Sequence, residues 1–177
     1  MSTVLPPPKG VFDEMMLDAT TPRSAYRSYH TWLAKVAEQE LRSKRSEAEL
    51  LFQRVGITFA VYGEEEGAER LIPFDFVPRI IPAEEWRLLE AGLKQRVAAL
   101  NAFLKDIYGE QAIIKAGIVP ADNVLCNAQY QIAMQGIKLF RDIYAHIAGI
   151  DLIRHSDGNY YVLEDNLRTP SGVSYMM

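Results

Sequence analysis

The chain has 177 residues, 49% hydrophobic and 24% charged, a balance that excludes a disordered or fibrous protein and predicts a folded, water-soluble domain. The formal net charge of −4 gives no reason to expect a nucleic-acid or membrane surface, because both need clustered Lys and Arg. A single cysteine, Cys126, excludes an intrachain disulfide, and without an apolar membrane span or a secretory-type start we expect a cytoplasmic protein.

The N-terminal third is predicted to contain a lead-in, two helices and a hairpin. Residues 1–22 include three consecutive prolines and are expected to be extended, and the domain is expected to occupy residues 23–177. Ser24 to Val55 predicts two helices, which Gly56 ends. Two segments rich in β-branched and aromatic residues then predict a hairpin with an acidic tip, namely Ile57–Tyr62 and Arg70–Phe76 around Glu64–Glu66.

The strongest helix signal follows a proline-bounded segment. Pro78 and Pro82 predict an extended edge or loop, and from Ala83 to Tyr108 apolar residues recur every three or four positions. We expect this helix to cover one face of a sheet. Its apolar positions are Trp86, Leu89, Leu93, Val97, Leu100, Leu104 and Ile107.

The last predicted elements are a short helix and two strands. The helix spans Gln111–Ala116, and the strands span about Phe140–Arg154 and Asn159–Leu167. With the earlier elements they predict an α+β fold, with a mixed, largely antiparallel sheet and covering helices.

The turn between the two final strands sets their pairing. Asp157-Gly158 is a strong two-residue turn signal, because both central residues of such a turn need positive φ. Counting back from it places Asp151 opposite Glu164. Side chains alternate along a strand, so Asn166 shares the face of Glu164, and three oxygen-bearing side chains converge.

Two carboxylates opposite each other repel, and here their neighbours in sequence are apolar. A hard cation such as Mg²⁺ or Mn²⁺ suits Asp151, Glu164 and Asn166, with phosphate oxygens completing its shell. The alternative is that both acids are simply hydrated near a sheet end, or that one pairs with Arg154 or Arg168.

Long motifs in the chain resemble the circularly permuted ATP-grasp family, which is related to glutathione synthetase and glutathionylspermidine synthetase. The resemblance spans roughly residues 10–177 and covers the expected metal hairpin with its Glu-x-Asn pattern. Its motifs are Ile57-Thr-Phe-Ala-Val-Tyr-Gly63, Ile72-Pro-Phe-Asp-Phe-Val-Pro-Arg-Ile-Ile-Pro82, His146-Ile-Ala-Gly-Ile-Asp-Leu-Ile-Arg154 and Val162-Leu-Glu-Asp-Asn-Leu-Arg-Thr-Pro-Ser-Gly-Val-Ser-Tyr175.

The resemblance implies that ATP phosphorylates a carboxylate and that an amine then attacks the acyl phosphate to give an amide or peptide bond. It implies that Asp151, Glu164 and Asn166 hold Mg²⁺ or Mn²⁺ against the phosphates. Arg168 would contact the transferred phosphoryl group, or be a plain exposed arginine. Ser171 and Gly172 would offer backbone N–H groups to a phosphate, or form an ordinary turn.

The resemblance also implies that residues 23–177 are the N-terminal portion of an ATP-grasp domain, truncated after the metal-binding hairpin. Family members continue well past this point and carry most of their nucleotide contacts there. We therefore expect the chain to be inactive alone, with the missing half supplied by another chain. The alternative is a noncatalytic scaffold or interaction domain, or a nonfunctional truncation, that retains the family core.

Overall fold

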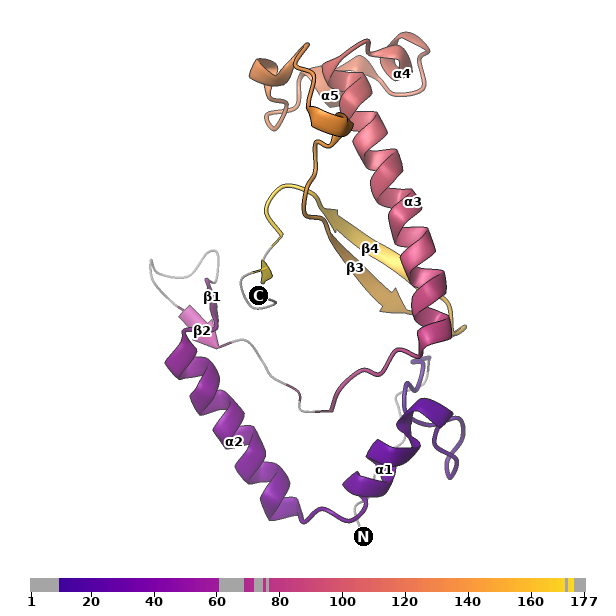
Figure 1. Cartoon of the computed structure of the whole chain (residues 1–177), viewed down its shortest axis with the longest axis vertical. Helices are drawn as coiled ribbons and strands as arrows, with labels where there is room; N and C mark the ends of the chain where they lie inside the picture. Colours follow the sequence, from indigo (N-terminus) through magenta and orange to yellow (C-terminus); the bar gives the residue numbers. More distant parts are fainter. Residues whose placement is uncertain (1–9, 61–68, 72–74, 76, 171, 174–177) are drawn as a thin grey trace. The chain divides into compact units, whose positions relative to one another are not determined.

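The computed structural model describes residues 10–60, 69–71, 75, 77–170, 172 and 173 (Figure 1). The chain divides into two compact units. One comprises residues 1–82, 155–159 and 175–177, and the other comprises residues 83–154 and 160–174.

The first unit contains the predicted N-terminal helices. A 3₁₀ turn, η1 (Ser24–Tyr26), leads into α1 (Arg27–Leu33), and α2 spans Glu38–Val55. Gly56 ends α2 in the left-handed conformation, with φ 74° and ψ 32°, so the predicted helix stop is confirmed.

A short hairpin follows α2. Strand β1 (Thr58–Ala60) pairs antiparallel with β2 (Glu69–Leu71). The predicted acidic tip, Glu64–Glu66, and most of the predicted continuation to Phe76 lie outside the described residues, and Asp75 is not in a strand.

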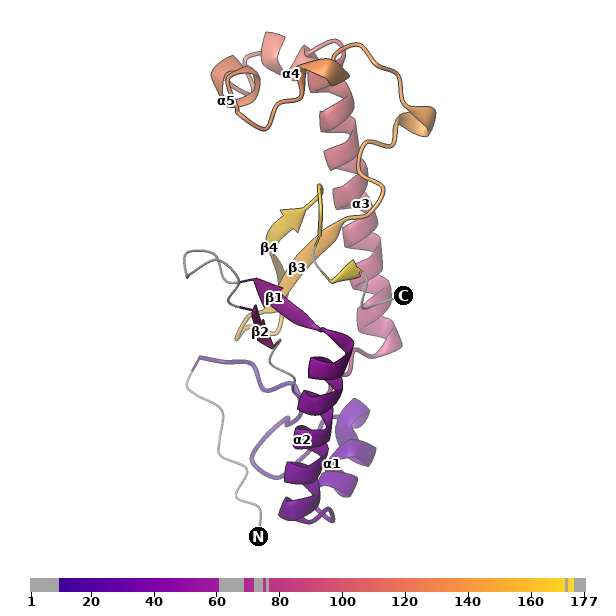
Figure 2. The same ribbon diagram turned by 90° about the vertical axis from the view of Figure 1, so that its left-hand side faces the viewer.

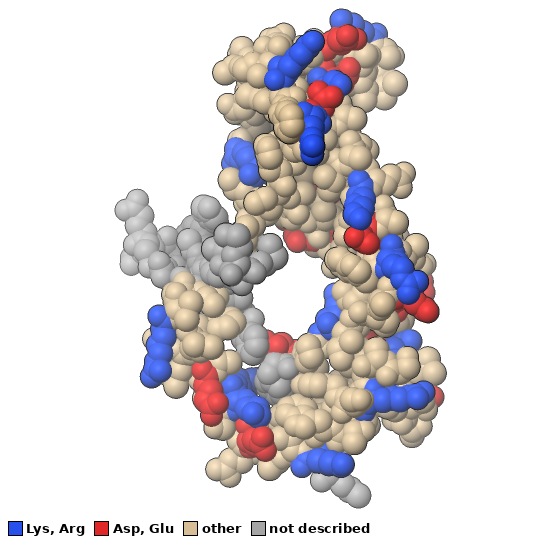
Figure 3. All heavy atoms as spheres, viewed as in Figure 1, with Lys and Arg blue, Asp and Glu red and all other residues tan. Residues whose placement is uncertain are grey.

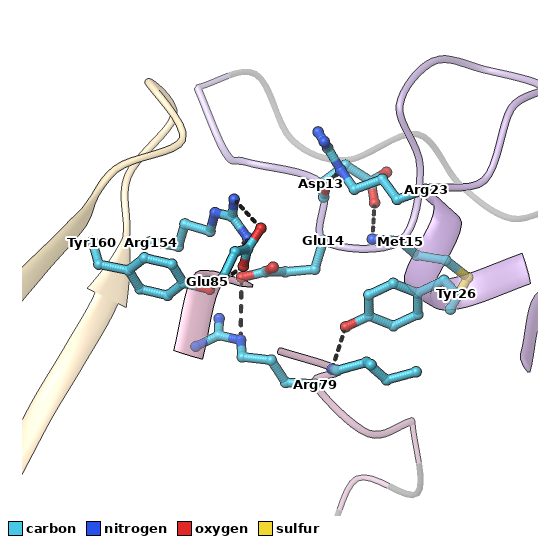
Figure 4. Close-up of polar contacts among 10 residues, drawn as sticks. Asp13, Glu14, Met15, Arg23, Tyr26, Arg79, Glu85, Arg154 and Tyr160 are labelled. Atoms are coloured by element: carbon cyan, nitrogen blue, oxygen red, sulfur yellow. Dashed lines mark hydrogen bonds and ion pairs between the residues drawn. The ribbon is translucent and has the colours of Figure 1, made fainter. Parts of the chain in front are cut away.

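The segment between Pro78 and Pro82 is irregular, as predicted. The Tyr26 hydroxyl accepts the backbone N–H of Ile80 at 2.7 Å, and Arg79 forms an ion pair with Glu14 at 3.2 Å (Figure 4). The first contact satisfies a backbone N–H group that a strand would otherwise pair, and the second is between side chains.

The second unit is built on α3, which spans Ala83–Tyr108, the bounds that its apolar periodicity predicted. It is followed by α4 (Ala112–Lys115), α5 (Ala121–Leu125) and the 3₁₀ turns η2 (Ile132–Met134) and η3 (Phe140–Asp142). Strands β3 (Gly149–Arg154) and β4 (Tyr160–Asn166) complete it.

The strand predicted to begin at Phe140 begins at Gly149 instead. Residues 140–142 form η3, where Arg141 and Asp142 both have a φ of 57°. The side-chain oxygen of Asn101 on α3 accepts the N–H groups of residues 144 and 145 at 2.7 and 2.9 Å. These donors are therefore not free for a strand ladder, and the prediction was wrong here.

The buried cluster of this unit lies at the C-terminal end of α3. Ile107 and Tyr108 of α3 pack with Val124 of α5. The Tyr108 ring stacks on Tyr130, with 4.9 Å between the ring centroids, and on Tyr144, with 6.2 Å. Aromatic packing of this kind fixes the end of α3 against the chain that leads to β3.

Helices and antiparallel strands confirm the α+β class. Within the described residues, however, the strands form two separate two-stranded sheets rather than the single mixed sheet that was expected, because each strand pairs only with its neighbour in sequence. Helix α3 lies along the β3–β4 hairpin, as Figures 1 and 2 both show.

The surface carries mixed charge. Oppositely charged side chains lie near one another along the face of α3 seen in Figure 3, and the Glu90–Lys94 pair on this helix has a separation of 2.8 Å. Among the described residues, no helix is both long enough and apolar enough to cross a membrane.

Candidate metal centre

The turn between β3 and β4 is a three-residue loop, not the two-residue turn that Asp157-Gly158 predicted. The N–H of His155 donates to the carbonyl oxygen of Asn159 at 3.0 Å, and the N–H of Gly158 donates to that of His155 at 2.9 Å. Gly158 has a φ of 84°, a conformation that a residue without a Cβ adopts at little cost. Residues 156–158 form the loop.

The loop shifts the residue pairs nearest to it by one residue relative to the prediction. A β-bulge further along the hairpin restores the predicted pairing. Arg154 lies opposite Tyr160, one residue earlier than predicted. The ladder then changes register at Leu163, an extra residue on β4, and Asp151 lies opposite Glu164. The predicted pairing of the two acids is therefore present, although the turn was wrong.

The hairpin has one open face and one face toward α3. Asp151 and Glu164 are exposed and Asn166 is half-buried, all on the open face. Arg154 and Asp165 belong to the other face, where both pair with residues of α3. This alternation places the three candidate ligands on one accessible surface, as predicted.

Asn166 joins the two carboxylates. Its side-chain nitrogen donates to Glu164 Oε1 at 2.8 Å and lies 3.5 Å from Asp151 Oδ2. The amide thus places partial positive charge between two acids. Rotating it by 180° would turn its oxygen toward the same point, so the group is suited to ligating a cation there.

Glu164 affects the titration of the Asp151 carboxyl group. The pKa of Asp151 is raised above its usual value, first because nearby protein atoms displace part of the water around this exposed side chain, and then because it can form a hydrogen bond with Glu164 and is repelled by the charge of that residue. A positive ion between them would relieve this repulsion.

The donor set fits a hard divalent cation that shares its shell with phosphate. Mg²⁺ is commonly bound through one or two carboxylates with substrate phosphates and water, rather than by an all-protein cage. Two carboxylates and an amide match that pattern. No group of three or more His, Cys, Asp or Glu side chains suited to a metal occurs among the described residues.

Two polar contacts attach the far face of the hairpin to α3. Arg96 donates to both carboxylate oxygens of Asp165, at 2.7 and 2.5 Å. Near the turn, Glu85 accepts from Arg154 at 3.0 and 3.1 Å and from the Tyr160 hydroxyl at 3.0 Å (Figure 4). Sequence patterns did not predict these contacts, which join residues about 70 positions apart.

The segment after β4 contains the other predicted site residues. Arg168 is exposed and donates a hydrogen bond to the side-chain oxygen of Gln129. Gly172 has a φ of 80°, and Ser171 lies outside the described residues. The structure therefore gives Arg168 a neutral partner and does not bring it into a contact with the three candidate ligands.

Gly149 was missed by the sequence reasoning. A Cβ built on it would lie 2.8 Å from the Cβ of Pro170, which is closer than side chains approach. Gly149 also lies opposite Asn166 in the ladder. The absence of a side chain here lets the segment after β4 fold back onto β3, and a glycine at the start of the strand that carries Asp151 was the available signal.

A surface hollow of about 730 Å³ lies elsewhere in the second unit. Its lining comes from the C-terminal end of α3 and the chain around residues 136–144, including Lys105, Tyr108 and Tyr144. None of its lining residues belongs to β3 or β4. The candidate metal centre is thus an open sheet face and not part of this hollow.

Comparison with known proteins shows that part of the chain matches a protein family. Residues 78–177 match the family described as "A circularly permuted ATPgrasp". A protein of Synechocystis is 43% identical to this chain, in a match that covers 96% of the chain and 35% of the relative. A protein of Mycobacterium leprae is 42% identical, in a match that covers 94% of the chain and 29% of the relative.

A third relative has a functional name. The protein called "Putative glutamate--cysteine ligase 2-2" in Frankia casuarinae is 42% identical over 94% of this chain and 19% of its own length. The chain thus spans about a third or less of the length of these relatives. The family match covers more than half of the chain, including α3 and the whole β3–β4 hairpin, and the chain therefore belongs to the circularly permuted ATP-grasp family.

Proposed function

We propose that this chain is the metal-binding part of an ATP-dependent ligase that joins a carboxylate to an amine through an acyl phosphate. The observation that carries the proposal is the convergence of Asp151, Glu164 and Asn166 on the open face of the hairpin. In such a reaction an oxygen of the substrate carboxylate attacks the terminal phosphorus of ATP and ADP leaves. The amine then attacks the acyl carbon, loses a proton and displaces inorganic phosphate to form the amide.

Each of the three side chains has a defined task in this proposal. Asp151 and Glu164 supply the negative charge that holds Mg²⁺ or Mn²⁺, and Asn166 supplies a neutral oxygen that adds no further repulsion. A cation held by these side chains would neutralise the charge of the phosphate oxygens during phosphoryl transfer. The paired strands of the hairpin carry all three side chains, which limits the rearrangement needed to bind the ion and the phosphates.

The same open face offers apolar surface beside the acids. The exposed fractions of Ile153, Tyr161 and Leu163 are 43%, 49% and 66%. The bulge at Leu163 places this side chain next to Glu164 on the open face. Apolar surface beside a phosphate-binding metal supports a nucleotide as ligand, because it can pack against the base.

Arg168 is proposed to contact the transferred phosphoryl group or the acyl phosphate. It follows Asn166 by two residues, is exposed, and has a hydrogen bond to the uncharged Gln129. An amide partner does not neutralise the guanidinium, which therefore keeps its charge for an anionic substrate. Backbone N–H groups around Ser171 and Gly172 are proposed to assist in holding a phosphate.

The substrates are proposed only by class. The Frankia relative is named for joining glutamate to cysteine, which is a carboxylate–amine ligation, and this supports the same class for the present chain. The relatives extend well beyond the matched region, so we propose that further nucleotide contacts come from the corresponding additional sequence, in the same or another chain. We place the reaction in the cytoplasm because it uses ATP.

Metal binding by the chain tests the proposal directly. Mn²⁺ titrated into the protein should bind at one site, measured by calorimetry or by the loss of the free Mn²⁺ signal in electron paramagnetic resonance. Asp151→Asn should weaken this binding at least about tenfold, because it removes one of two charged ligands. Asp157→Asn makes the same chemical change in the loop of the same hairpin and should leave the affinity unchanged.

Two results would refute the assignment. If Mn²⁺ does not bind to the wild-type chain, the three side chains do not form a metal centre on their own. If Asp151→Asn and Asp157→Asn weaken binding equally, the metal responds to the general charge of the hairpin and not to the predicted ligands.

A further inference from the structure

The middle residue of the ligand-bearing segment faces away from the metal site. Glu164, Asp165 and Asn166 are consecutive, and the first and last belong to the open face. Asp165 points to the other face, where the Arg96 guanidinium contacts both of its oxygens, at 2.7 and 2.5 Å.

A two-bonded guanidinium contact fixes orientation as well as distance. The planar fork of Arg96 donates both hydrogen bonds to the carboxylate in one plane, so Asp165 cannot rotate freely. Side chains alternate along a strand, and holding Asp165 toward α3 therefore holds Glu164 and Asn166 toward the open face. An anchor is needed here because the bulge at Leu163 interrupts the ladder just before these residues.

The second contact, at Glu85, fits the same helix face. Arg96 follows Glu85 by eleven residues (96 − 85), which is about three helical turns and roughly 16 Å along α3. Asp165 follows Tyr160 by five residues (165 − 160), which corresponds to roughly 16 Å of regular strand, a length that the bulge reduces somewhat. The two spacings are therefore similar. The hairpin is thus attached to one side of α3 near both of its ends.

The Arg96–Asp165 contact is more exposed to solvent than the contact at Glu85, and this bears on what each contact does. The Arg96 side chain is 43% exposed and that of Asp165 18%, whereas Arg154 at the other contact is only 12% exposed. An exposed ion pair adds little to the stability of a fold. The consequence of the Arg96 contact therefore lies mainly in where it holds the ligand segment.

We infer that Arg96 is a positioning residue for the metal centre, which orients Glu164 and Asn166 by fixing Asp165 on the opposite face of β4. The inference rests on the proposed function for the identity of the bound ion. Contacts that orient metal ligands from behind commonly change metal affinity by about 10–100-fold when removed.

The experiment compares three variants with the wild-type chain, at a temperature where all are folded. Arg96→Gln removes the guanidinium fork, and Arg96→Lys keeps the charge without the fork. Glu85→Gln weakens the contact at the other end of the hairpin and serves as the matched control. Mn²⁺ affinity is measured for each, together with amide hydrogen exchange of residues 164–166 in the metal-free protein.

Arg96→Gln should weaken Mn²⁺ binding about tenfold or more and should remove exchange protection at residues 164–166. Arg96→Lys should restore neither property, because a single ammonium group does not fix a carboxylate plane. Glu85→Gln should lower the melting temperature while leaving Mn²⁺ affinity within about twofold of the wild type.

Unchanged exchange protection in Arg96→Gln would overturn the inference, whether or not the chain binds metal. So would wild-type Mn²⁺ affinity in either Arg96 variant, or an equal loss of affinity in Glu85→Gln. A wild-type chain that binds no Mn²⁺, with exchange at residues 164–166 still dependent on Arg96, would refute the proposed function but leave Arg96 as the residue that orients β4.

Discussion

Gly149 allows a strong test of how β3 and β4 are held, because one added methyl group should separate them from the segment that follows. In Gly149→Ala the new Cβ would lie 2.8 Å from the Cβ of Pro170 and 3.5 Å from that of Asn166. Carbon atoms prefer separations of about 3.5–4.0 Å, so Pro170 must move by roughly 1 Å. The proline ring cannot move aside by changing rotamer, and the backbone must shift instead.

Overpacking of this kind typically costs about 1–3 kcal/mol. Urea unfolding should therefore show Gly149→Ala to be less stable than the wild type by that amount. Mn²⁺ affinity should fall as well, because Gly149 lies opposite Asn166 in the ladder.

The chain offers an unusually close control. Gly92 lies exposed within α3, and a Cβ added there meets no atom within 4 Å. Gly92→Ala makes the same substitution but should stabilise the chain by about 0.5–1 kcal/mol, because alanine suits a helix interior better than glycine. The two variants should therefore shift stability in opposite directions.

A second control tests the cause of the clash. When Gly149→Ala is combined with Pro170→Gly, the Cβ atom that the added methyl group would meet is absent. The double variant should therefore lose less stability than the two single variants lose in total. The reasoning would be refuted if Gly149→Ala were as stable as the wild type, or if the effects of the two substitutions were simply additive.

Three further predictions concern other parts of the second unit. Replacing Arg154 by Ala removes two charged hydrogen bonds to a half-buried Glu85 and should cost about 1.5–3 kcal/mol in urea unfolding. Asp106→Ala removes the acceptor for two backbone N–H groups of α4 at 2.9 Å and should cost about 1–2 kcal/mol by the same assay. The third prediction concerns pH. The pKa of Asp151 is raised in the folded chain, so protonation of Asp151 stabilises the fold at low pH. This stabilisation is lost as the pH rises from the pKa of Asp151 in the unfolded chain through its pKa in the folded chain. Metal-free Asp151→Asn should therefore be slightly more stable than the wild type at pH 7, and equal melting temperatures across pH 3–7 would contradict this.

Local signals in the sequence predicted the elements whose ends are decided locally. The bounds of α3 follow from its own apolar periodicity and a proline just before it, and Gly56 ends α2 because glycine tolerates the left-handed conformation. The strand expected from Phe140 failed for the opposite reason. Asn101, about 40 residues away, binds the backbone that a strand would have used, and no pattern near Phe140 indicates this.

The site shows the same division between local and distant causes. Asp151, Glu164 and Asn166 could be named because alternation along strands and a short turn bring them together. Arg96 could not, because its contact with Asp165 joins residues 69 positions apart on different kinds of element. An arginine in the middle of an amphipathic helix gives no sign that it faces a carboxylate on a strand.

The pairing of the two acids was correct for a reason that the sequence did not reveal. The Asp157-Gly158 signal predicted a two-residue turn, but the loop has three residues, and this alone would have placed Asp151 opposite Leu163. The bulge at Leu163 restores the pairing of Asp151 with Glu164. It also places Leu163 and Glu164 together on the open face, so that an apolar side chain lies beside a carboxylate. Loop and bulge thus act together. The two acids are therefore opposed, as the proposed metal site requires, and the extra residue adds an exposed apolar side chain beside them.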